Sequence, residues 1–379
     1  MMEMAKLIDI CDIQYGYAFD SACFTDDNSY PPLVRVRDVK RGFSETFYAG
    51  KYPEEYILHA GNLLIGMDGE FNIARWKSID ALLNQRVCKL VAKEGTNEEY
   101  LRFAMVKELK VIEDKTAFVT VKHLSAKELN KLELDMPSLE EQELRANSLV
   151  NIEKIISLRK EEIRQLDNLI KARFVEVFGN PDTNSKGWNE CVLSEKLNVV
   201  GGYTFKSDQF DEISGIPVLR IGNINAGFFK PVNLVYWHED ENLERYAIYP
   251  GDLVMSLTGT VGKDDYGNVC ILGDEYEMYY LNQRNAKLEI KEGIDKYYLS
   301  QLLKFAQIKK RLTGISRGVR QANISNKDIL NLVVPVPPIE LQEQFANFVH
   351  QVDKSKVAVQ KALDETQLLF DSLMQQYFG

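Results

Sequence analysis

Two long stretches of the chain repeat apolar side chains every seven residues and contain neither proline nor glycine. The first lies between Pro137 and Gly179, and the second follows Pro338. The first stretch has Leu149, Ile156, Ile163, Ile170 and Val177 at one core position, and Ile152 and Leu166 at the other. The second has Val349, Leu363, Phe370 and Tyr377, then Val352, Val359 and Leu373. This pattern predicts two coiled-coil helices, each of about 40 residues and about 60 Å.

Two long amphipathic helices in one chain most simply bury their apolar stripes on each other. The alternative is that each stripe packs on its own globular domain. Four polar residues interrupt the predicted seam: Arg159, Arg173, Lys356 and Thr366. Such residues are expected to cost stability and to fix the register of the helices.

The remaining segments show short apolar runs bounded by Gly, Pro and Asp, which predict strands. Examples are PPLVRVRDV, GNLLIGMD, NQRVCKLVA, IPVLRIGNI and GDLVMSLTG. Helical patterns in these segments are short, as in EEYLRFAMVKEL and KYYLSQLLKFAQIKKRL. The mixture predicts compact domains of the α+β class.

The chain repeats itself once, because six matched segments occur twice in the same order, 185 to 200 residues apart. The matches are GYAF with GYTF, LVRV with VLRI, AGNLLI with PGDLVM, LNQR with LNQR, PSLEEQ with PPIELQ, and FG with FG. Chance does not explain six ordered matches, and such self-similarity indicates an internal duplication. Each copy consists of a globular part followed by a long helix.

This organisation predicts globular domains at residues 1–138 and 180–336, and long helices at 139–179 and 337–379. If the helices pair antiparallel, the two domains lie at opposite ends of a spacer and are related by an approximate twofold axis. DNA sites with two separated halves are read by proteins of this geometry.

Net charge, cysteine content and apolar runs limit the classes of protein to which the chain can belong, but they do not identify one class. The formal net charge of −10, taken alone, argues against a protein that binds nucleic acid, because phosphate binding needs clustered Lys and Arg. Net charge does not say where the basic residues lie. The five cysteines are scattered, which fits reduced thiols in the cytoplasm and neither a disulfide framework nor a zinc site. Membrane-length apolar runs and a secretory signal are both missing from the sequence.

The duplicated motifs and paired helices resemble the specificity (S) subunit of Type I restriction-modification systems. The residues that carry the resemblance are GYAF/GYTF, LVRVRD/VLRIGN, AGNLLI/PGDLVM, DGEFN, LNQR twice and PSLEEQ/PPIELQ. The resemblance implies that each globular part is a target recognition domain for one half of a bipartite double-stranded DNA sequence. It also implies that the helices dock two modification subunits, to which restriction subunits can be added.

The resemblance further implies that the chain is not itself catalytic and holds no cofactor or metal, since S-adenosylmethionine is bound by the modification subunit. The sequence agrees, because it lacks the N-P-P-[FYW] motif of adenine methylation. The segment Gly259–Lys263 is also no Walker A motif, since it lacks the first glycine and is followed by Asp264.

Side chains that read base edges or contact phosphates occur at three places in each copy. The aromatic turn and the strand after it supply Tyr17, Arg35, Arg37 and Lys40, then Tyr203, Lys206, Arg220, Asn223 and Asn225. The loop after the apolar strand supplies Asp68, Glu70, Asn72 and Arg75, then Thr258, Thr260 and Lys263. The third place supplies Lys115, Thr120, Lys122 and His123, then Arg317, Arg320, Gln321 and Asn323. The second place differs most between the copies, as expected for readers of different targets. Solvated surface loops are the alternative.

The motif LNQR is identical in both copies, so it should serve something independent of the target. One option is structural, with Asn and Gln satisfying buried backbone groups; the other is a common phosphate contact by Arg86 and Arg284. The structural option is favoured. Two other functions stay open: an interaction scaffold that binds protein, and the recognition part of a fused restriction-methylation enzyme.

Overall fold

The computed structural model describes residues 3–115, 122–224, 227–260, 263, 265–314 and 321–379. The chain forms two compact units. Unit 1 comprises Met1–Lys160 and Lys361–Gly379, and unit 2 comprises Glu161–Gln360. Each long helix therefore contributes one part to unit 1 and the other part to unit 2.

Unit 1 is built on a four-stranded antiparallel sheet with the order β2-β10-β7-β8. Its strands are β2 (Cys11–Tyr15), β10 (Val87–Ala92), β7 (Leu63–Gly66) and β8 (Asn72–Arg75). Three smaller sheets pair β4 (Leu33–Val34), β9 (Ala81–Leu83) and β6 (Ile57–Leu58); β1 (Glu3–Lys6) and β11 (Glu133–Met136); β3 (Phe24–Thr25) and β5 (Phe47–Tyr48). Its shorter helices are α1 (Leu7–Ile10), α2 (Val36–Arg41), α3 (Glu98–Lys115) and α4 (Ala126–Leu129).

Unit 2 repeats this topology with the sheet β13-β21-β17-β19. Its strands are β13 (Leu197–Gly201), β21 (Asn285–Ile290), β17 (Leu253–Ser256) and β19 (Val269–Ile271). The smaller sheets contain β15 (Val235–Trp237), β14 (Ile216–Leu219), β20 (Tyr279–Leu281) and β16 (Ala247–Ile248); β12 (Glu190–Val192) and β23 (Val333–Pro335); β18 (Thr258–Thr260) and β22 (Gln321–Asn323). Its shorter helices are α6 (Lys296–Leu302), α7 (Ala306–Thr313) and α8 (Asn326–Leu330).

The strand directions show the same duplication. In unit 1, β9 pairs parallel with β4 and antiparallel with β6; in unit 2, β20 pairs parallel with β14 and antiparallel with β16. Serine capping boxes start α4 and α8, where the N–H groups of Ser125 and Ser325 donate to Glu128 and Asp328 over 2.8 and 2.9 Å. The predicted α+β class and internal repeat are confirmed.

The two long helices are α5 (Leu139–Phe178) and α9 (Ile339–Phe378). A buried glutamine fixes the start of each to its globular domain. Gln142 donates to the carbonyl of Pro137 (2.9 Å) and accepts from the N–H of Asn97 (2.9 Å). Gln342 donates to Pro337 (2.7 Å) and accepts from Asp295 (2.8 Å). The repeated PSLEEQ/PPIELQ motif is thus explained by its glutamine.

Helices α5 and α9 pair antiparallel within each unit, as predicted. In unit 1, Arg145 donates to the carbonyl of Tyr377 (3.1 Å), and Arg159 donates to Ala362 and Thr366. In unit 2, Lys356 lies 2.6 Å from Asp167. Three of the four polar seam residues therefore have polar partners across the helix pair, which satisfies their buried or half-buried groups.

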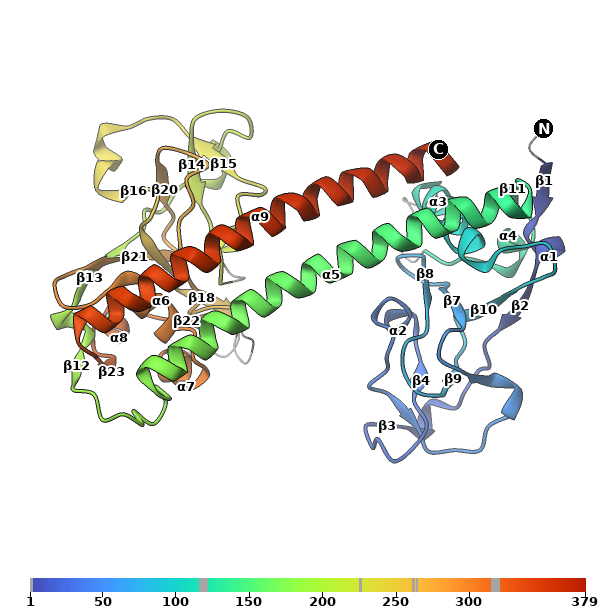
Figure 1. Cartoon of the computed structure of the whole chain (residues 1–379), viewed down its shortest axis with the longest axis horizontal. Coiled ribbons are helices and arrows are strands. Elements are labelled where there is room, and N and C mark those ends of the chain that lie inside the picture. The colour runs from blue at the N-terminus through green and yellow to red at the C-terminus, as the bar shows by residue number, and fades with distance from the viewer. Residues whose placement is uncertain (1–2, 116–121, 225–226, 261–262, 264, 315–320) are drawn as a thin grey trace. The chain divides into compact units, whose positions relative to one another are not determined.

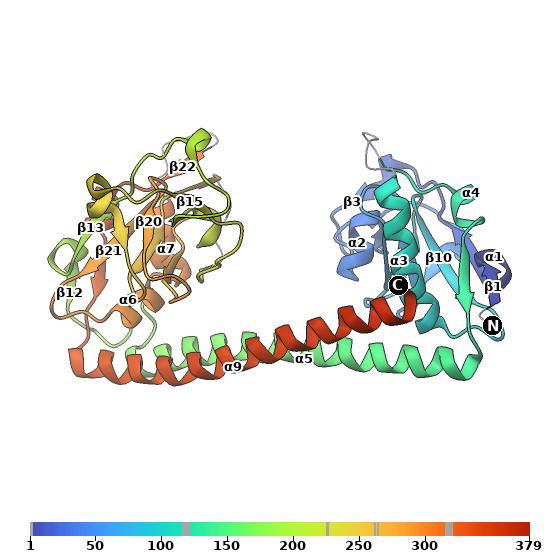
Figure 2. The same cartoon turned by 90° about the horizontal axis from the view of Figure 1, so that it is seen from above.

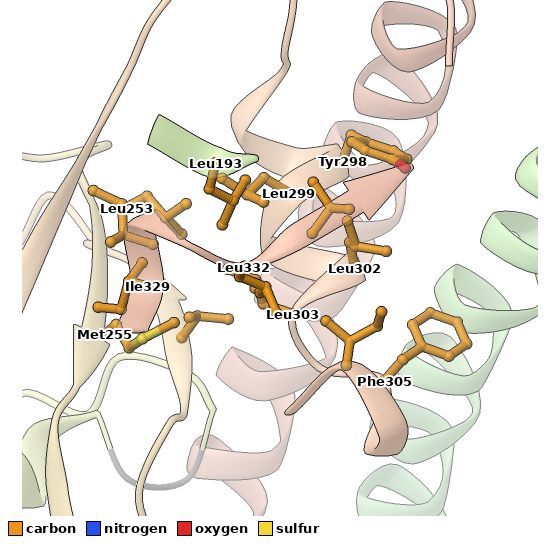
Figure 3. Packing of buried hydrophobic residues seen from close by; sticks show 14 of the residues in the cluster. Leu193, Leu253, Met255, Tyr298, Leu299, Leu302, Leu303, Phe305, Ile329 and Leu332 are labelled. Atoms are coloured by element: carbon orange, nitrogen blue, oxygen red, sulfur yellow. The ribbon is translucent and has the colours of Figure 1, made fainter. Parts of the chain in front are cut away.

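The helix stripes also pack on the globular domains, so the two predicted alternatives are combined. In unit 2, Phe174, Phe178 and Phe345 share one hydrophobic core with the sheet and with α6. Figure 3 shows this core, with Leu253 and Met255 of β17 on one side, Leu302 of α6 on the other, and Leu332 between them. In unit 1, the end of α9 lies beside α3 (Figure 2), where the rings of Phe378 and Tyr100 are 5.2 Å apart.

No helix in the described ranges combines the length and the apolar character that crossing a membrane requires.

Candidate nucleic-acid interface

The GYxF and LNQR motifs form one backbone frame in each unit. Tyr17 N–H donates to the carbonyl of Leu83 (3.0 Å), and Tyr17 carbonyl accepts from Gln85 N–H (2.8 Å). The same pair of bonds joins Tyr203 to Leu281 (2.8 Å) and to Gln283 (2.9 Å). The two motifs repeat together because each completes the hydrogen bonds of the other.

The glycine of GYxF permits this close approach. A Cβ at Gly16 would lie 2.0 Å from the carbonyl oxygen of Asn84, and one at Gly202 would lie 2.2 Å from that of Asn282. Both asparagines are buried, 7% and 8% exposed, whereas the following Gln and Arg are exposed in both units. The predicted structural role of the LNQR side chains is wrong for Gln, which faces solvent together with Arg in both units. The Asn side chains are buried, and Asn282 accepts from the N–H of Arg284 over 3.3 Å.

An aromatic group stands beside each frame. Tyr17 contacts Phe19 and Tyr56, with ring centroids 5.1 Å apart in both pairs. Tyr203 contacts Phe205 (5.0 Å) and Tyr246 (5.3 Å). The two phenylalanines are buried, whereas Tyr17 and Tyr203 are 41% and 37% exposed. Tyr56 and Tyr246 were missed from the sequence, although extending the AGNLLI/PGDLVM match backwards aligns them.

In unit 1 the structure brings the second and third predicted places together. Asp68 and His123 form an isolated antiparallel bridge, and their side chains are 2.6 Å apart. Arg86 of LNQR joins them, with its Nε 3.6 Å from Asp68 and its Nη1 3.0 Å from His123. An open hollow of about 280 Å³ at this point is lined by Gln85, Arg86 and His123 among others.

Unit 2 makes the same junction with different residues. Strands β18 and β22 pair antiparallel and lie next to each other in Figure 1, with Thr258 opposite Asn323 and Thr260 opposite Gln321. The N–H of Thr260 donates to Asp265 (2.8 Å), which lowers the pKa of that carboxyl. Lys263 is exposed, and its N–H donates to the carbonyl of Thr260 (3.0 Å).

The first predicted place of unit 1 lies on and before α2. Arg35, Arg37 and Lys40 are all exposed. Arg37 donates to Thr46 (3.3 Å), and Lys40 pairs with Glu70 of the second place over 3.3 Å. The three predicted places are therefore in contact in unit 1.

The first place of unit 2 contains one correction. Asn223 is 3% exposed, and its amide donates to the carbonyls of Lys230 and Val232 while accepting from Arg220 N–H. It satisfies buried backbone and is not available to DNA, contrary to the prediction. Arg220 itself donates to the carbonyl of Asn233 (2.7 Å), and Lys206 is exposed.

Other predicted residues are already held by the protein. The guanidinium of Arg75 donates to Glu98 and to the carbonyl of Gly61, both at 2.6 Å, and pairs with Glu99. Lys122 pairs with Glu113 at 3.0 Å in a half-buried position. These contacts give Arg75 and Lys122 structural roles that the sequence did not reveal, because their partners lie elsewhere in the chain.

Of two further predicted residues, Asn72 is partly buried by the protein and Lys115 is open to solvent. Asn72 is half-buried and donates to the carbonyl of Glu70 (3.0 Å). Lys115 is exposed at the end of α3. Four predicted residues lie outside the described residues, as does the side chain of Gln321: Thr120, Asn225, Arg317 and Arg320.

Three cysteines of the described residues are buried in the domain cores. Burial raises the pKa of Cys11, Cys88 and Cys270 to about 12, so these thiols stay protonated at neutral pH. Within the described ranges, no cluster of His, Cys, Asp and Glu could hold a metal ion. The exposed groups around each frame can donate or accept hydrogen bonds.

Comparison with known proteins gives the same family over nearly the whole chain. The family model described as "Type I restriction modification DNA specificity domain" matches residues 1–168 and 185–366. The specificity subunit of the Type I restriction enzyme EcoBI from Escherichia coli is 28% identical, over 97% of this chain and 84% of its own length. The MjaVIII specificity subunit from Methanocaldococcus jannaschii is 25% identical, over 88% and 83%.

Two solved structures share the fold. The S subunit of the Type I restriction-modification system of M. genitalium matches with a TM-score of 0.59 and 16% identity, over 100% of this chain and 96% of that one. A structure concerned with complex assembly and conformational transition of the type I R-M system matches with a TM-score of 0.51 and 17% identity, over 99% and 97%.

Proposed function

Because this chain belongs to the family of Type I restriction-modification DNA specificity domains, we propose that each unit reads one half of a two-part DNA sequence. Recognition of DNA sequence is the function that family membership assigns to the chain. The two-part target, the docking of partners and the individual contacts are our proposal.

One observation carries the proposal: the two units share a frame and differ at its edge. The backbone bonds of GYxF and LNQR are the same in both. At the junction beside them, unit 1 has Asp68 with His123, and unit 2 has Thr258 with Asn323. A constant frame with variable edge residues is what two readers of different sequences require.

The edge residues have the chemistry of base recognition. Carboxylate, imidazole, hydroxyl and amide groups distinguish the donors and acceptors of base pairs in the major groove. We assign this role to Asp68, Glu70 and Asn72 in unit 1, and to Thr258, Thr260, Lys263 and Asn323 in unit 2. The exposed cations Arg35, Arg37, Lys40, Lys115 and Lys206, and the half-buried Arg220, are assigned to phosphates, which position the protein without reading sequence.

The long helices are proposed to dock two modification subunits. In unit 1, α5 exposes Leu144, Ile155 and Leu158, which are 67%, 41% and 59% exposed. Ile155 and Leu158 follow Leu144 by eleven and fourteen residues, which is about three and about four turns, so the three side chains lie on one face of the helix, separate from the seam. Exposed apolar stripes of this kind mark surfaces that another protein covers. The partner, with its bound S-adenosylmethionine, supplies the methyl transfer, and restriction subunits add to that assembly.

The proposal is tested by expressing the chain with its cognate modification subunit in a host that lacks adenine methylation and mapping methylated adenines. The expected result is one motif with two defined halves and an undefined spacer. The modification subunit without this chain is the control and should give no motif. A continuous motif, or the same motif in the control, would contradict the proposal.

A further inference from the structure

The repeated Leu-Asn-Gln-Arg turn has an inner half and an outer half. Leu83 and Asn84 are buried, as are Leu281 and Asn282, whereas the Gln and Arg that follow are exposed in both units. The backbone frame explains the inner half, because Asn84 and Asn282 pack against the glycines of GYxF. It does not explain why two exposed side chains are the same in both units.

A structural ion pair does not explain the arginine either. In unit 1, Arg86 lies 3.6 Å from Asp68 and 3.0 Å from His123. The corresponding positions beside Arg284 in unit 2 are Thr258 and Asn323, which are not acidic. If the arginine were needed only to pair with an acid, unit 2, which has Thr258 at the position of Asp68, would not need Arg284. The arginine stays while its neighbours differ.

Both arginines border the edge that we assign to base reading. Their carbonyls accept from the N–H groups of Met67 and Leu257, each at 2.8 Å, and these residues directly precede Asp68 and Thr258. On the other side, the N–H groups of Gln85 and Gln283 donate to the carbonyls of Tyr17 and Tyr203. Guanidinium, amide and phenol groups therefore adjoin each reading edge, and all three can donate hydrogen bonds.

We propose that Arg86 and Arg284 each contact a phosphate of the DNA backbone beside the half-site that their unit reads. The inference rests on the proposed function, because it requires both units to bind duplex DNA. A target-independent side chain next to a target-dependent edge fits a group that is the same in every duplex, and the phosphodiester is that group. Arginine forms strong bidentate bonds with phosphate oxygens.

The test uses the assembled complex with its modification subunits and two labelled duplexes, the mapped two-part target and a scrambled sequence. The variants Arg86→Gln and Arg284→Gln are titrated alone and together across about 50 to 200 mM salt. Each single variant should raise Kd for both duplexes by the same factor, about tenfold at low salt. Each should also reduce the slope of log Kd against log salt by about 0.9, and the double variant by about twice that.

Two controls separate a phosphate contact from other roles. Lys51→Gln removes an exposed cation of unit 1 outside the frame and should leave Kd and slope unchanged. Arg86→Lys and Arg284→Lys keep the charge but lose bidentate bonding, so the salt slope should return while Kd recovers only in part. Subunit composition of every variant is measured by light scattering, so a folding or assembly defect is seen directly.

Three results would overturn the inference. A changed ratio of target to scrambled affinity would mean that the arginines read bases. Unchanged Kd and slope would mean that they do not touch DNA, and loss of modification subunits would mean that the turn binds the partner protein. Failure of the proposed function looks different, because then the unmutated complex itself would not prefer the mapped target.

Discussion

At the scale of single residues, the two units use the same few polar and small side chains to hold their frames. The N–H of Arg35 donates to Asp38, and the N–H of Arg220 donates to Asn223, both over 2.9 Å. Asp38 and Asn223 are buried, so the carboxylate of one copy and the amide of the other both accept the backbone N–H of the arginine three residues earlier. This equivalence explains why the sequence misassigned Asn223: an exposed reader and a buried cap have the same residue type, and only the fold tells them apart.

The close approach at Gly202 should make this residue sensitive to any side chain. Gly202→Ala places a methyl group 2.2 Å from the carbonyl oxygen of Asn282, a backbone atom that cannot move away alone. We expect a loss of about 2 kcal/mol in the free energy of unfolding by urea. Gly222→Ala is the matched control in the same unit, because no heavy atom lies within 4 Å of its Cβ. Equal stability of the two variants would show that the frame does not need the glycine.

Exchange of two edge residues should change one half of the target. Replacing Thr258 by Asp and Asn323 by His gives unit 2 the pair that unit 1 carries at Asp68 and His123. Because one well-formed base contact discriminates by about 1–3 kcal/mol, methylome mapping should show a changed base preference in one half-site. The other half-site and the spacer should be unaltered. Changes in both halves would mean that the edges do not act separately.

At the scale of elements, ion pairs fix helix α3 of unit 1 between the sheet and α5. Glu99 lies between Arg75 of β8 and Arg102, and Arg102 also pairs with Glu153 of α5 over 2.6 Å. Heptad spacing predicts α5 and α9 well because the seven-residue period is a local pattern of apolar residues along the chain. The pairing of the two-residue strands and this ion-pair network depend on contacts between distant residues, which no local pattern records.

The network should make unit 1 sensitive to acid. Burial raises the pKa of Glu99, but the hydrogen bonds and charges of Arg102 and Arg75 outweigh it and hold the pKa below its ordinary value of 4.5. A carboxyl group whose pKa is lowered by folding stabilises the fold when the pH is above the pKa of that group in the unfolded chain. This stabilisation is lost as the pH falls through the pKa of the group in the folded chain. The urea concentration at the unfolding midpoint should therefore decrease as the pH is lowered below about 4.5. Glu99→Gln should make this decrease smaller.

The control for this pH dependence is Glu143→Gln, an exposed carboxylate of unit 1 with no ion pair among the described residues. Its profile should follow that of the unmutated chain. If Glu99→Gln kept the full acid-dependent loss of stability, other carboxylates would have to account for it.

At the scale of the whole molecule, the duplication could be read from the sequence, but the limits of the folding units could not. Ordered motif matches revealed two copies and located the GYxF and LNQR frames. The seam pattern, however, does not distinguish an apolar residue that faces the other helix from one that also enters a domain core. The structure makes α5 and α9 parts of both units, so the boundary of each unit falls inside the helices.

This boundary predicts how a recognition unit can be exchanged. Phe174 of α5 is fully buried, with ring centroids 5.3, 5.1 and 5.4 Å from Tyr298, Phe305 and Phe345. A graft of residues 161–360 from a relative carries both sides of this core, whereas a graft of 180–336 leaves Phe174 and Phe345 facing foreign partners. Mismatch at such an aromatic core costs about 3 kcal/mol or more.

Both grafts should change only one half of the methylated motif, but the longer one should be the more stable. Urea unfolding of the two chimaeras, together with methylome mapping in complex with the modification subunit, measures both quantities. The shorter graft serves as the control for the boundary, because it carries the same frame and edge residues. Equal stability of the two chimaeras would mean that the helix residues adapt to either domain, and the unit would then end where the helix begins.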